Sequence, residues 1–476
     1  MIYIRIGLKW RKSFYFGGLP MAGRLPATAA RFCRLIPPTP LTVQTLARPL
    51  ARGFGSAPVQ PSGADTPGQI TTQKYRDMTP AQRRDYLTLK HGLPSNSLDI
   101  IGGEGKFQTQ LVIGVGKMPI CLIEDVPVCF VTPNGTQTTT KLLGIPHSLP
   151  EGSIPAGMKY CVDAVRNAGR HFEVTPAKSL MYSTVQLVFK TGISETQIQA
   201  TADAILSQEQ ALLHEVNTHP ALVNMFNRGG GALKLEVRIL PPPDPSACYM
   251  AVVQATADVC QAQGANYLTR LAHVLAVPLQ KMVAPNAETL TRILSNYGGL
   301  RVTTCSVAFP GAALATKHVC AAEMQRRIPL VIEYAYRDPV IRGCTARKGG
   351  DKNGGLGVVN AIGEDVPAYV AGLESHDTRV QATPLENGDI RFRLAQPTVA
   401  GLVSRQHYEH ASILFALCGI KTIPDLYAVI SIASMCTAIM APRALADDIG
   451  ITGHHEDRFV PPKSKTTSTG SAKTES

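Results

Sequence analysis

Glycine clusters are the first features of this chain that could serve chemistry, because backbone N–H groups in glycine-rich turns can bind phosphates. Such clusters occur at residues 229–231 and 349–350. In a dinucleotide fingerprint the glycines join a strand to a helix, and an acidic residue follows about 20 residues later. Neither cluster has this pattern. The local glycine motifs therefore do not identify a cofactor by themselves.

The eleven cysteines could bind a metal or form disulfides if their spacing allowed it. They are scattered singly, with no CxxC pair, and their number is odd. Zinc ribbons need paired cysteines, and a disulfide framework usually has an even number of them. We therefore expect reduced thiols and no metal site.

Strands and helices alternate in the middle of the chain and would position any functional residues there. Apolar patterns predict strands at 185–189, 233–240, 249–259 and 300–308, and helices at 194–216 and 264–275. A strand-helix-strand-strand-helix-strand order is the signature of a ferredoxin-like module, with the exact assignment of the fourth strand open. We expect this module as a small domain at 180–295, inserted into a large mixed α/β domain made of 73–179 and 296–445. The fold class is α+β.

Local signals also place elements of the large domain. Thr79 as N-cap and Pro80 at the first helical position predict a helix that runs to Lys90. Asn134 followed by Gly135 predicts a hairpin turn. Further helices are expected at 158–168, 410–419 and 423–440.

The longest apolar run, residues 426–441, raises the question of a membrane span. It is shorter than the roughly 20 residues that a span needs, and Ser431, Ser434 and Thr437 interrupt it. We expect a buried helix there and no membrane anchor.

The formal net charge of +12 is concentrated near the N-terminus. The first acidic residue is Asp65, and nine Lys and Arg precede it, which leaves 38 basic against 35 acidic residues in the rest of the chain. A nearly neutral body argues against a nucleic-acid partner.

The acid-free leader is rich in Arg, Ser, Thr and Ala, which is typical of a mitochondrial import sequence. We interpret residues 1–55 as a transit peptide, because 51–56 resembles a processing site, and we expect the mature chain in the mitochondrial matrix. Met21 is an alternative initiator, and a basic tail without a targeting role is the alternative to a presequence. Residues 56–72, rich in Pro, Gly, Ser and Thr, are expected to be a linker.

Blocks in the first part of the chain occur at 75–83, at 111–120 and at 150–154, and the last continues at 175–188. Their order resembles the hydroxymethylglutaryl-coenzyme A (HMG-CoA) reductase family in its class II form, and the resemblance extends to about residue 456. It implies that Arg76 contacts coenzyme A and that Glu151 is the catalytic glutamate. Ser153 would lie beside Glu151 in the substrate site.

The small domain carries the next blocks, at 219–223, 228–231, 235–238 and 261–266. By resemblance, Gln261, Gly264 and Asn266 bind the nicotinamide cofactor, although Gln261 replaces the aspartate that is usual there. Family members that prefer NADH can carry an aspartate near the position of Pro220, so its absence leaves NADPH open. Arg405 is assigned to the cofactor site because Ser404 and Arg405 replace a Gly-Gly pair.

The most informative blocks follow at 293–296, 338–342, 348–354, 363–365 and 453–454. By resemblance, Arg342 binds the substrate carboxylate, Lys348 is the catalytic lysine and Asp365 is the catalytic aspartate. Asn353 supports the site, and His454 is the catalytic histidine.

One extra residue lies between Lys348 and Asn353, so Lys352 stays an alternative to Lys348, and His455 is one residue away from His454. Residues 446–476 would form a short C-terminal flap and a disordered tail.

These residue types suit the reaction that the resemblance implies, the NADPH- or NADH-dependent reduction of HMG-CoA to mevalonate and coenzyme A, or its reverse. A buried ammonium such as that of Lys348 stabilises an oxyanion. A desolvated Glu151 can transfer a proton while Asp365 orients the pair, and an imidazole can protonate the coenzyme A thiolate. Arg342 offers a fork to the free carboxylate. The expected partners are a thioester substrate, of which coenzyme A is a part, and a second copy of the chain in a homodimer or higher oligomer.

Two other readings stay open. One is a degenerate family member with a structural or regulatory role, favoured by Gln261, Gln263, Ser404 and Arg405. The other is an unrelated α+β matrix enzyme.

Overall fold

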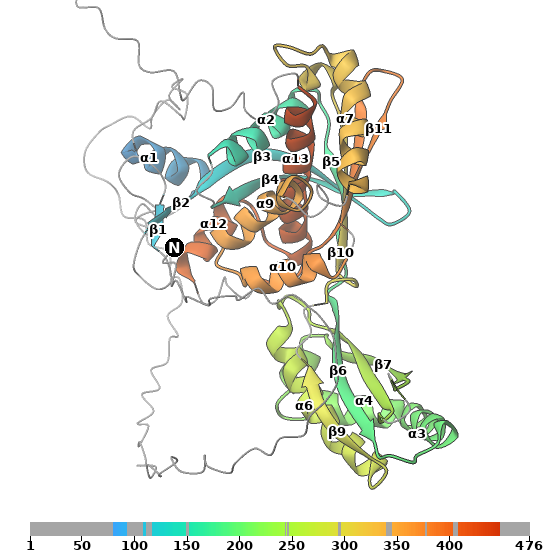
Figure 1. Ribbon diagram of the computed structural model, residues 1–476. Helices are drawn as coiled ribbons and strands as arrows, with labels where there is room; N and C mark the ends of the chain where they lie inside the picture. Colours follow the sequence, from blue (N-terminus) through green and yellow to red (C-terminus); the bar gives the residue numbers. More distant parts are fainter. Residues whose placement is uncertain are drawn as a thin grey trace, which may run out of the picture. The chain divides into compact units, whose positions relative to one another are not determined.

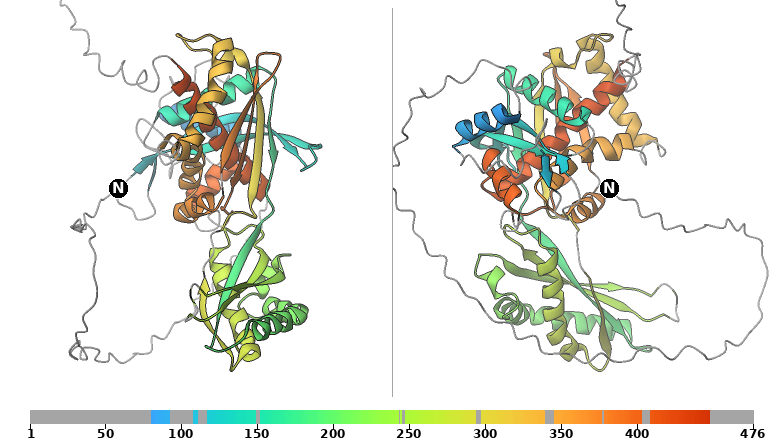
Figure 2. Two further views of the ribbon diagram at one scale, coloured as in Figure 1. Left: turned by 45° about the vertical axis from the view of Figure 1, so that its right-hand side comes forward. Right: turned by 90° about the vertical axis from the view of Figure 1, so that its left-hand side faces the viewer.

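The computed structural model describes residues 80–92, 108–110, 117–148, 152–242, 244, 247–293, 297–338, 345–376, 378–402 and 408–447. Figure 1 shows their helices and strands, and Figure 2 shows them from two further directions. All of them fall within one compact unit of the chain, residues 69–476.

The larger sheet is built from strands that lie on both sides of the small domain in the sequence. They are β3 (Cys121–Val131), β4 (Gln137–His147), β5 (Phe172–Thr175), β10 (Val302–Phe309), β11 (Arg379–Pro384) and β12 (Ile390–Pro397). The order of these described strands is β11-β12-β10-β5-β3-β4, and β3 and β5 are parallel. The turn at Asn134 and Gly135 joins β3 to β4, and Gly135 adopts a φ of 80°, which glycine tolerates without strain. The expected hairpin is confirmed.

Helices surround this sheet. They are α1 (Pro80–His91), α2 (Ser153–Asn167), α7 (Ala321–Arg337), α9 (Thr345–Ala361), α10 (Val366–Glu374), α12 (Glu409–Leu417) and α13 (Ile423–Ala446), with a short 3-10 turn, η2 (Gly311–Leu314). Two short strands, β1 (Gln108–Gln110) and β2 (Lys117–Pro119), pair with each other.

Helix α13 forms the centre of the large domain. Its start is fixed by a capping box in which Thr422 and Asp425 bond to each other's backbone N–H groups. It packs against α9, α2 and α7. Among the described helices it alone is long and apolar enough to cross a membrane, but 89% of its most apolar window is buried inside the protein. Its hydrophobicity is therefore accounted for by packing in the core.

The smaller sheet has the topology expected from the sequence. Its described strands are β6 (Leu180–Phe189), β7 (Gly231–Leu240), β8 (Met250–Asp258) and β9 (Ala287–Ile293), in the antiparallel order β7-β8-β6-β9. The helices that connect them are α3 (Glu195–Ser207), α4 (Glu209–Thr218), α5 (Val223–Phe226) and α6 (Ala265–Val283). This is the ferredoxin-like arrangement, so the α+β fold class is confirmed.

Two details of that prediction are wrong. The fourth strand of the module is β9, which pairs with β6, whereas residues 302–309 form β10 and pair with β12 and β5 of the larger sheet. Both segments have strand-like patterns, and a local pattern does not reveal which sheet supplies the partner strands. The helix expected at 194–216 is divided at Gln208 into α3 and α4.

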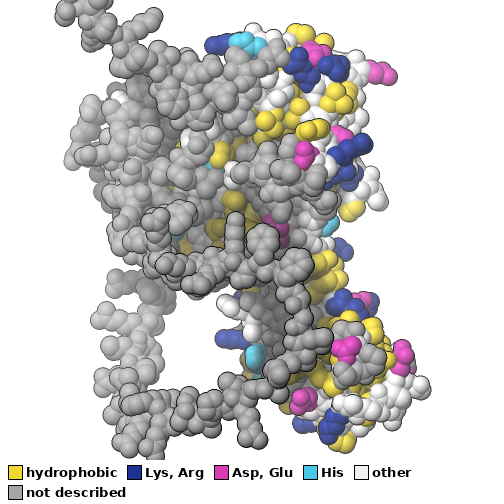
Figure 3. Space-filling model, in the orientation of Figure 1, with side chains coloured by type: hydrophobic (Ala, Val, Ile, Leu, Met, Phe, Trp, Pro, Cys, Tyr) yellow, Lys and Arg dark blue, Asp and Glu magenta, His cyan; other side chains and the backbone are white. Residues whose placement is uncertain are grey.

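The described surface carries charges of both signs. On the described part of the face shown in Figure 3, Lys and Arg side chains lie among Asp and Glu side chains. Pairs such as Lys159 with Asp163 and Arg326 with Glu323 follow one another along exposed helices. This mixture agrees with the nearly neutral body expected from the sequence.

Candidate functional site

Helix α9 is the element around which the candidate catalytic residues are arranged. The end of β4 is joined to it by three hydrogen bonds. His147 Nε2 donates to the carbonyl of Asn353 at 3.3 Å, the Ser148 N–H donates to the Gly357 carbonyl at 2.9 Å, and Asn360 Nδ2 donates to the Ser148 carbonyl at 2.8 Å. These bonds attach the end of β4, up to Ser148, directly to α9.

Glycines explain how α9 can approach its neighbours so closely. A Cβ atom at Gly357 would lie 2.1 Å from His147 Nε2, and one at Gly354 would lie 2.0 Å from the Ala433 carbonyl oxygen of α13. A side chain at Gly354 would require the backbone of α9 or α13 to shift, and one at Gly357 would displace the His147 ring. The glycine-rich sequence of α9 thus serves packing rather than phosphate binding at these positions.

His147 is a buried, neutral histidine. Its side chain is 1% exposed, and burial lowers its pKa to about 4, although the bond to Asn353 acts in the opposite direction. Because Nε2 carries the proton in that bond, Nδ1 is left as an acceptor, and it has no hydrogen-bond partner among the described residues. No sequence pattern pointed to this residue, because its surroundings depend on the approach of α9.

Acidification should destabilise the protein through His147. The folded imidazole has a pKa of about 4, and a free imidazole has one near 6.5. Between these values the unfolded chain binds a proton that the folded chain excludes, so stability falls as the pH falls. The contribution is about 2 kcal/mol between pH 7 and pH 5, since a tenfold difference in proton affinity corresponds to about 1.4 kcal/mol. Urea unfolding at the two pH values measures it.

His147→Gln is the matched variant for this experiment, because the amide can still donate to the Asn353 carbonyl but does not titrate. In this variant the loss of unfolding free energy between pH 7 and pH 5 should be smaller than in the wild type by about 2 kcal/mol. Burial also lowers the pKa of His410, and that contribution is retained in both proteins. An unchanged slope in the variant would contradict the buried neutral state of His147.

The structure places the predicted catalytic residues that it describes on or beside α9. Lys348 and Lys352 both belong to this helix, and residues four apart share one helical face, so both stay candidates. Asn353 directly follows Lys352 and is half-buried. Asp365 is exposed and caps α10, where its Oδ1 accepts from the Ala368 N–H at 2.9 Å. Ser153 is the exposed first residue of α2.

Several predicted site residues fall outside the described part of the chain. They are Arg76, Glu151, Arg342, Arg405 and His454, and the side chains of Lys348 and Lys352 also lie outside it. Their assigned roles stay predictions.

The predicted cofactor residues surround the start of α6. Gly264 precedes this 19-residue helix with a φ of 110°, and a Cβ atom there would lie 2.8 Å from Met181 Sδ. Gln263 Oε1 accepts from the Ala265 N–H at 3.0 Å, while Asn266 is exposed in the first turn. The Gln261 carbonyl accepts from the Leu402 N–H at 2.8 Å. The positive end of the α6 dipole therefore lies beside these residues, although Gly264 and Ala265 are buried and the Ala265 N–H is already bonded to Gln263.

A cavity of about 370 Å³ lies next to this helix start. Its lining residues are Met225, Arg228, Val259, Cys260, Gln261, Ala262 and Leu402. The size is within the range of small-molecule sites, roughly 300–1,000 Å³. Arg228 is an exposed cation in this lining, which contains no acidic residue. The sequence prediction did not assign Arg228 to the cofactor, although its place directly before the glycine run was a usable signal.

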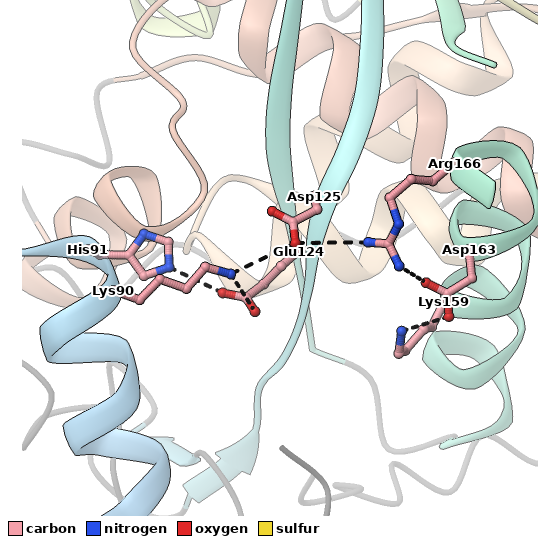
Figure 4. Close-up of polar contacts among 7 residues, drawn as sticks. All are labelled: Lys90, His91, Glu124, Asp125, Lys159, Asp163 and Arg166. Atoms are coloured by element: carbon pink, nitrogen blue, oxygen red, sulfur yellow. Dashed lines mark hydrogen bonds and ion pairs between the residues drawn. The ribbon is translucent and has the colours of Figure 1, made fainter. Parts of the chain in front are cut away.

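A second polar cluster joins α1, β3 and α2 and is shown in Figure 4. It consists of Lys90, His91, Glu124, Asp125, Lys159, Asp163 and Arg166. Glu124 lies 3.1 Å from both Lys90 and His91, and Asp125 lies 3.9 Å from Arg166. Burial alone would lower the pKa of Lys90, but its hydrogen bond to Glu124 raises it. The cluster holds α1 against the sheet, close in sequence to Arg76.

The fold is similar to solved structures of HMG-CoA reductase from Streptococcus pneumoniae. The class II enzyme bound to NADPH in open conformations aligns with a TM-score of 0.66 at 22% identity, over 79% of this chain and 100% of that chain. Two further structures of the enzyme from the same organism have TM-scores of 0.65 and 0.66, each at 22% identity. They cover 79% and 82% of this chain, and 99% and 90% of their own.

No curated protein sequence matches this chain. The sequence model of the family described as hydroxymethylglutaryl-coenzyme A reductase matches residues 93–458. This region contains both sheets and extends over well more than half of the 476 residues. The chain therefore belongs to the hydroxymethylglutaryl-coenzyme A reductase family.

Proposed function

We propose that the protein is an active reductase that converts HMG-CoA and two molecules of NADPH or NADH into mevalonate and coenzyme A, or catalyses the reverse reaction. The observation that carries this proposal is the family match over 93–458, which includes Glu151, Lys348, Asp365 and His454 in order. The cavity beside α6 supports it, because a dinucleotide needs a positively polarised site of that size.

The described residues fit a nicotinamide dinucleotide. Gln261, Gly264 and Asn266 surround the start of α6, and Arg228 lines the cavity. Arg405, outside the described residues, is proposed for the same site from the family resemblance. When bound, the reduced nucleotide supplies the hydride. In the first turn of α6 the N–H groups of Asn266 and Tyr267 have no acceptor within the helix and can donate to phosphate oxygens, whereas the Ala265 N–H is bonded to Gln263 Oε1.

The catalytic roles proposed for this chain follow from the chemistry of a thioester. Reduction places negative charge on the carbonyl oxygen, and the ammonium of Lys348 stabilises it. Glu151 transfers a proton to the aldehyde oxygen, and Asp365 orients the pair. His454 protonates the departing coenzyme A sulfur, because an imidazole titrates near neutral pH. Arg342 binds the substrate carboxylate and Arg76 contacts coenzyme A.

The direct test is NADPH oxidation by the purified protein, followed by absorbance in the presence of HMG-CoA. Two nucleotides should be oxidised for each mevalonate formed. Nucleotide and coenzyme A binding without turnover in either direction would instead support the degenerate alternative, which Gln261 in place of aspartate and Ser404 with Arg405 favour.

NADPH should be used at least as well as NADH. Gln261 and Pro220 lack the negative charge that would repel a 2′-phosphate, and Arg228 adds a cation to the cavity. The measurement is kcat/KM for the two nucleotides. A preference for NADH of tenfold or more, about 1.4 kcal/mol, would contradict the charge argument. Arg228→Ala should weaken the use of NADPH more than that of NADH.

We also propose that the protein acts in the mitochondrial matrix and forms a homodimer or a higher oligomer. Exposed apolar side chains on α7, namely Leu330 at 57% and Tyr334 at 63%, lie one turn apart and support a surface for association.

Residues 1–60 fused to a reporter should be sufficient for mitochondrial import. The segment holds nine basic residues and no acidic one, and a negative matrix potential attracts such a sequence. Microscopy of the fusion measures the outcome, and a matched fusion with its arginines replaced by glutamine is the control. A cytosolic reporter would refute the targeting proposal and leave the enzymatic one intact.

A further inference from the structure

Arg301 is a buried cation between the cofactor site and the large domain. It directly precedes β10 and is 0% exposed. Its NH1 donates to the Gln263 carbonyl at 2.6 Å, and its NH2 lies 3.5 Å from the Ala262 carbonyl. The same guanidinium thus contacts two successive carbonyls of the turn that opens α6.

NH1 also lies 3.2 Å from the Met181 sulfur of β6 in the small domain, and the remaining side-chain contacts of Arg301 belong to the large domain. NH2 donates to the Ala400 carbonyl at 2.8 Å and to the Tyr427 hydroxyl of α13. The guanidinium also lies over the Tyr427 ring, 5.4 Å from its centroid. The Arg301 side chain therefore connects the turn of residues 261–264, which precedes α6, to the segment after β12 and to helix α13.

No described acidic residue pairs with Arg301, and its Nε has no hydrogen-bond partner among the described residues. Burying a charge without a counter-charge is unfavourable, so a cation at this place is expected to have a specific use. Three carbonyl oxygens and the Tyr427 hydroxyl surround the guanidinium, and these uncharged acceptors do not neutralise its positive charge.

The turn is held on its other side by residues 401 and 402. A Cβ atom at Gly401 would lie 2.3 Å from the backbone nitrogen of Gln263, and the Leu402 N–H donates to the Gln261 carbonyl at 2.8 Å. Since C=O and N–H point in opposite directions across a trans peptide, carbonyls that face Arg301 turn the following N–H groups away from it. Both contacts thus fix the orientation of the peptides next to the cavity.

We propose that Arg301 is a positioning residue for the anionic dinucleotide. It fixes the turn of residues 261–264, and its uncompensated charge favours phosphate groups in the adjoining cavity. This inference rests on the proposed function, because it concerns the same nucleotide site. It predicts that loss of the hydrogen bonds between Arg301 and this turn weakens nucleotide binding much more than it weakens thioester binding or lowers kcat.

The experiment compares full-length wild-type protein with Arg301→Lys, which keeps the charge but loses the fork, and Arg301→Gln, which keeps a donor but loses the charge. NADPH binding is measured by nucleotide fluorescence without substrate, and KM is measured for each substrate. Arg301→Lys should raise the Kd and KM for NADPH about tenfold, and Arg301→Gln should raise them further. KM for HMG-CoA and kcat should change less than about twofold.

Arg170→Lys is the matched control, because Arg170 also bonds a backbone carbonyl, that of Ala308 at 2.7 Å, and pairs with Asp389 away from the cavity. It should leave nucleotide KM unchanged. If the Arg301 variants do not fold, Gly401→Ala, which presses on the same turn from the other side, should produce the same selective loss of NADPH binding.

The outcomes separate the two proposals. A wild-type protein that binds neither nucleotide refutes the proposed function. A wild-type protein that binds NADPH, with Arg301 or Gly401 variants that bind it equally well or that lose HMG-CoA affinity to the same extent, overturns the role of Arg301 alone.

Discussion

Lys348→Ala should lower kcat by at least about a hundredfold to a thousandfold while leaving nucleotide and coenzyme A binding nearly intact. The reason is that the ammonium is proposed to act on an oxyanion that exists only after hydride transfer has begun. A donor that acts on developing charge contributes about 2.7–4 kcal/mol in comparable sites, and its loss appears in kcat rather than in KM. Steady-state kinetics together with NADPH fluorescence would measure both effects.

Lys352→Ala is the natural control, since Lys352 lies one turn further along α9 on the same helical face. It should keep most of the activity. The reverse pattern, an inactive Lys352→Ala and an active Lys348→Ala, would move the catalytic role by one turn and leave the family assignment unchanged. Full activity of both variants would contradict an oxyanion-stabilising lysine on α9.

The sequence was sufficient where short-range signals determine the structure. The Asn134-Gly135 turn, the start of a helix after Ser194 and the first three strands of the small domain were predictable from local pattern. The position of the fourth strand was not, because β9 and β10 have similar patterns and differ only in which sheet offers an edge.

In the candidate site, too, some residues were predictable from the sequence and others depend on tertiary packing. The roles of Lys348 and Asp365 came from a resemblance between ordered blocks, and the helical spacing of α9 adds the shared face of the two lysines. His147 and Arg301 could not be predicted, because each depends on a partner brought close by tertiary packing. An isolated histidine or arginine in a sequence gives no sign of burial.

The glycines of α9 were visible in the sequence, but their structural role could not be predicted from it. A glycine cluster suggested phosphate binding, which the surrounding pattern excluded. The structure supplies a reason for two later glycines of the same helix, since Gly354 and Gly357 let α9 approach the backbone of α13 and the ring of His147. Close approach of these elements is what places α9 next to the end of β4.

Gly354→Ala should therefore destabilise the protein by about 2–3 kcal/mol or more. Its Cβ would lie 2.0 Å from the Ala433 carbonyl oxygen and 2.4 Å from the carbonyl carbon, and a backbone group cannot rotate out of the way as a side chain can. One of the two helices must shift, and such overpacking typically costs about 1–3 kcal/mol, occasionally more. Urea unfolding at neutral pH measures the loss.

Gly157→Ala on α2 is the matched control. This helical glycine also faces α13, but its Cβ would meet only the Met440 side chain, at 3.4 Å and beyond, which is ordinary contact. Replacing an interior helical glycine by alanine without a clash stabilises a helix by up to about 1 kcal/mol. The two substitutions should thus have opposite signs. If Gly354→Ala were as stable as Gly157→Ala, α9 and α13 would not pack at the described distance, and the position of Lys348 relative to the core would have to be revised.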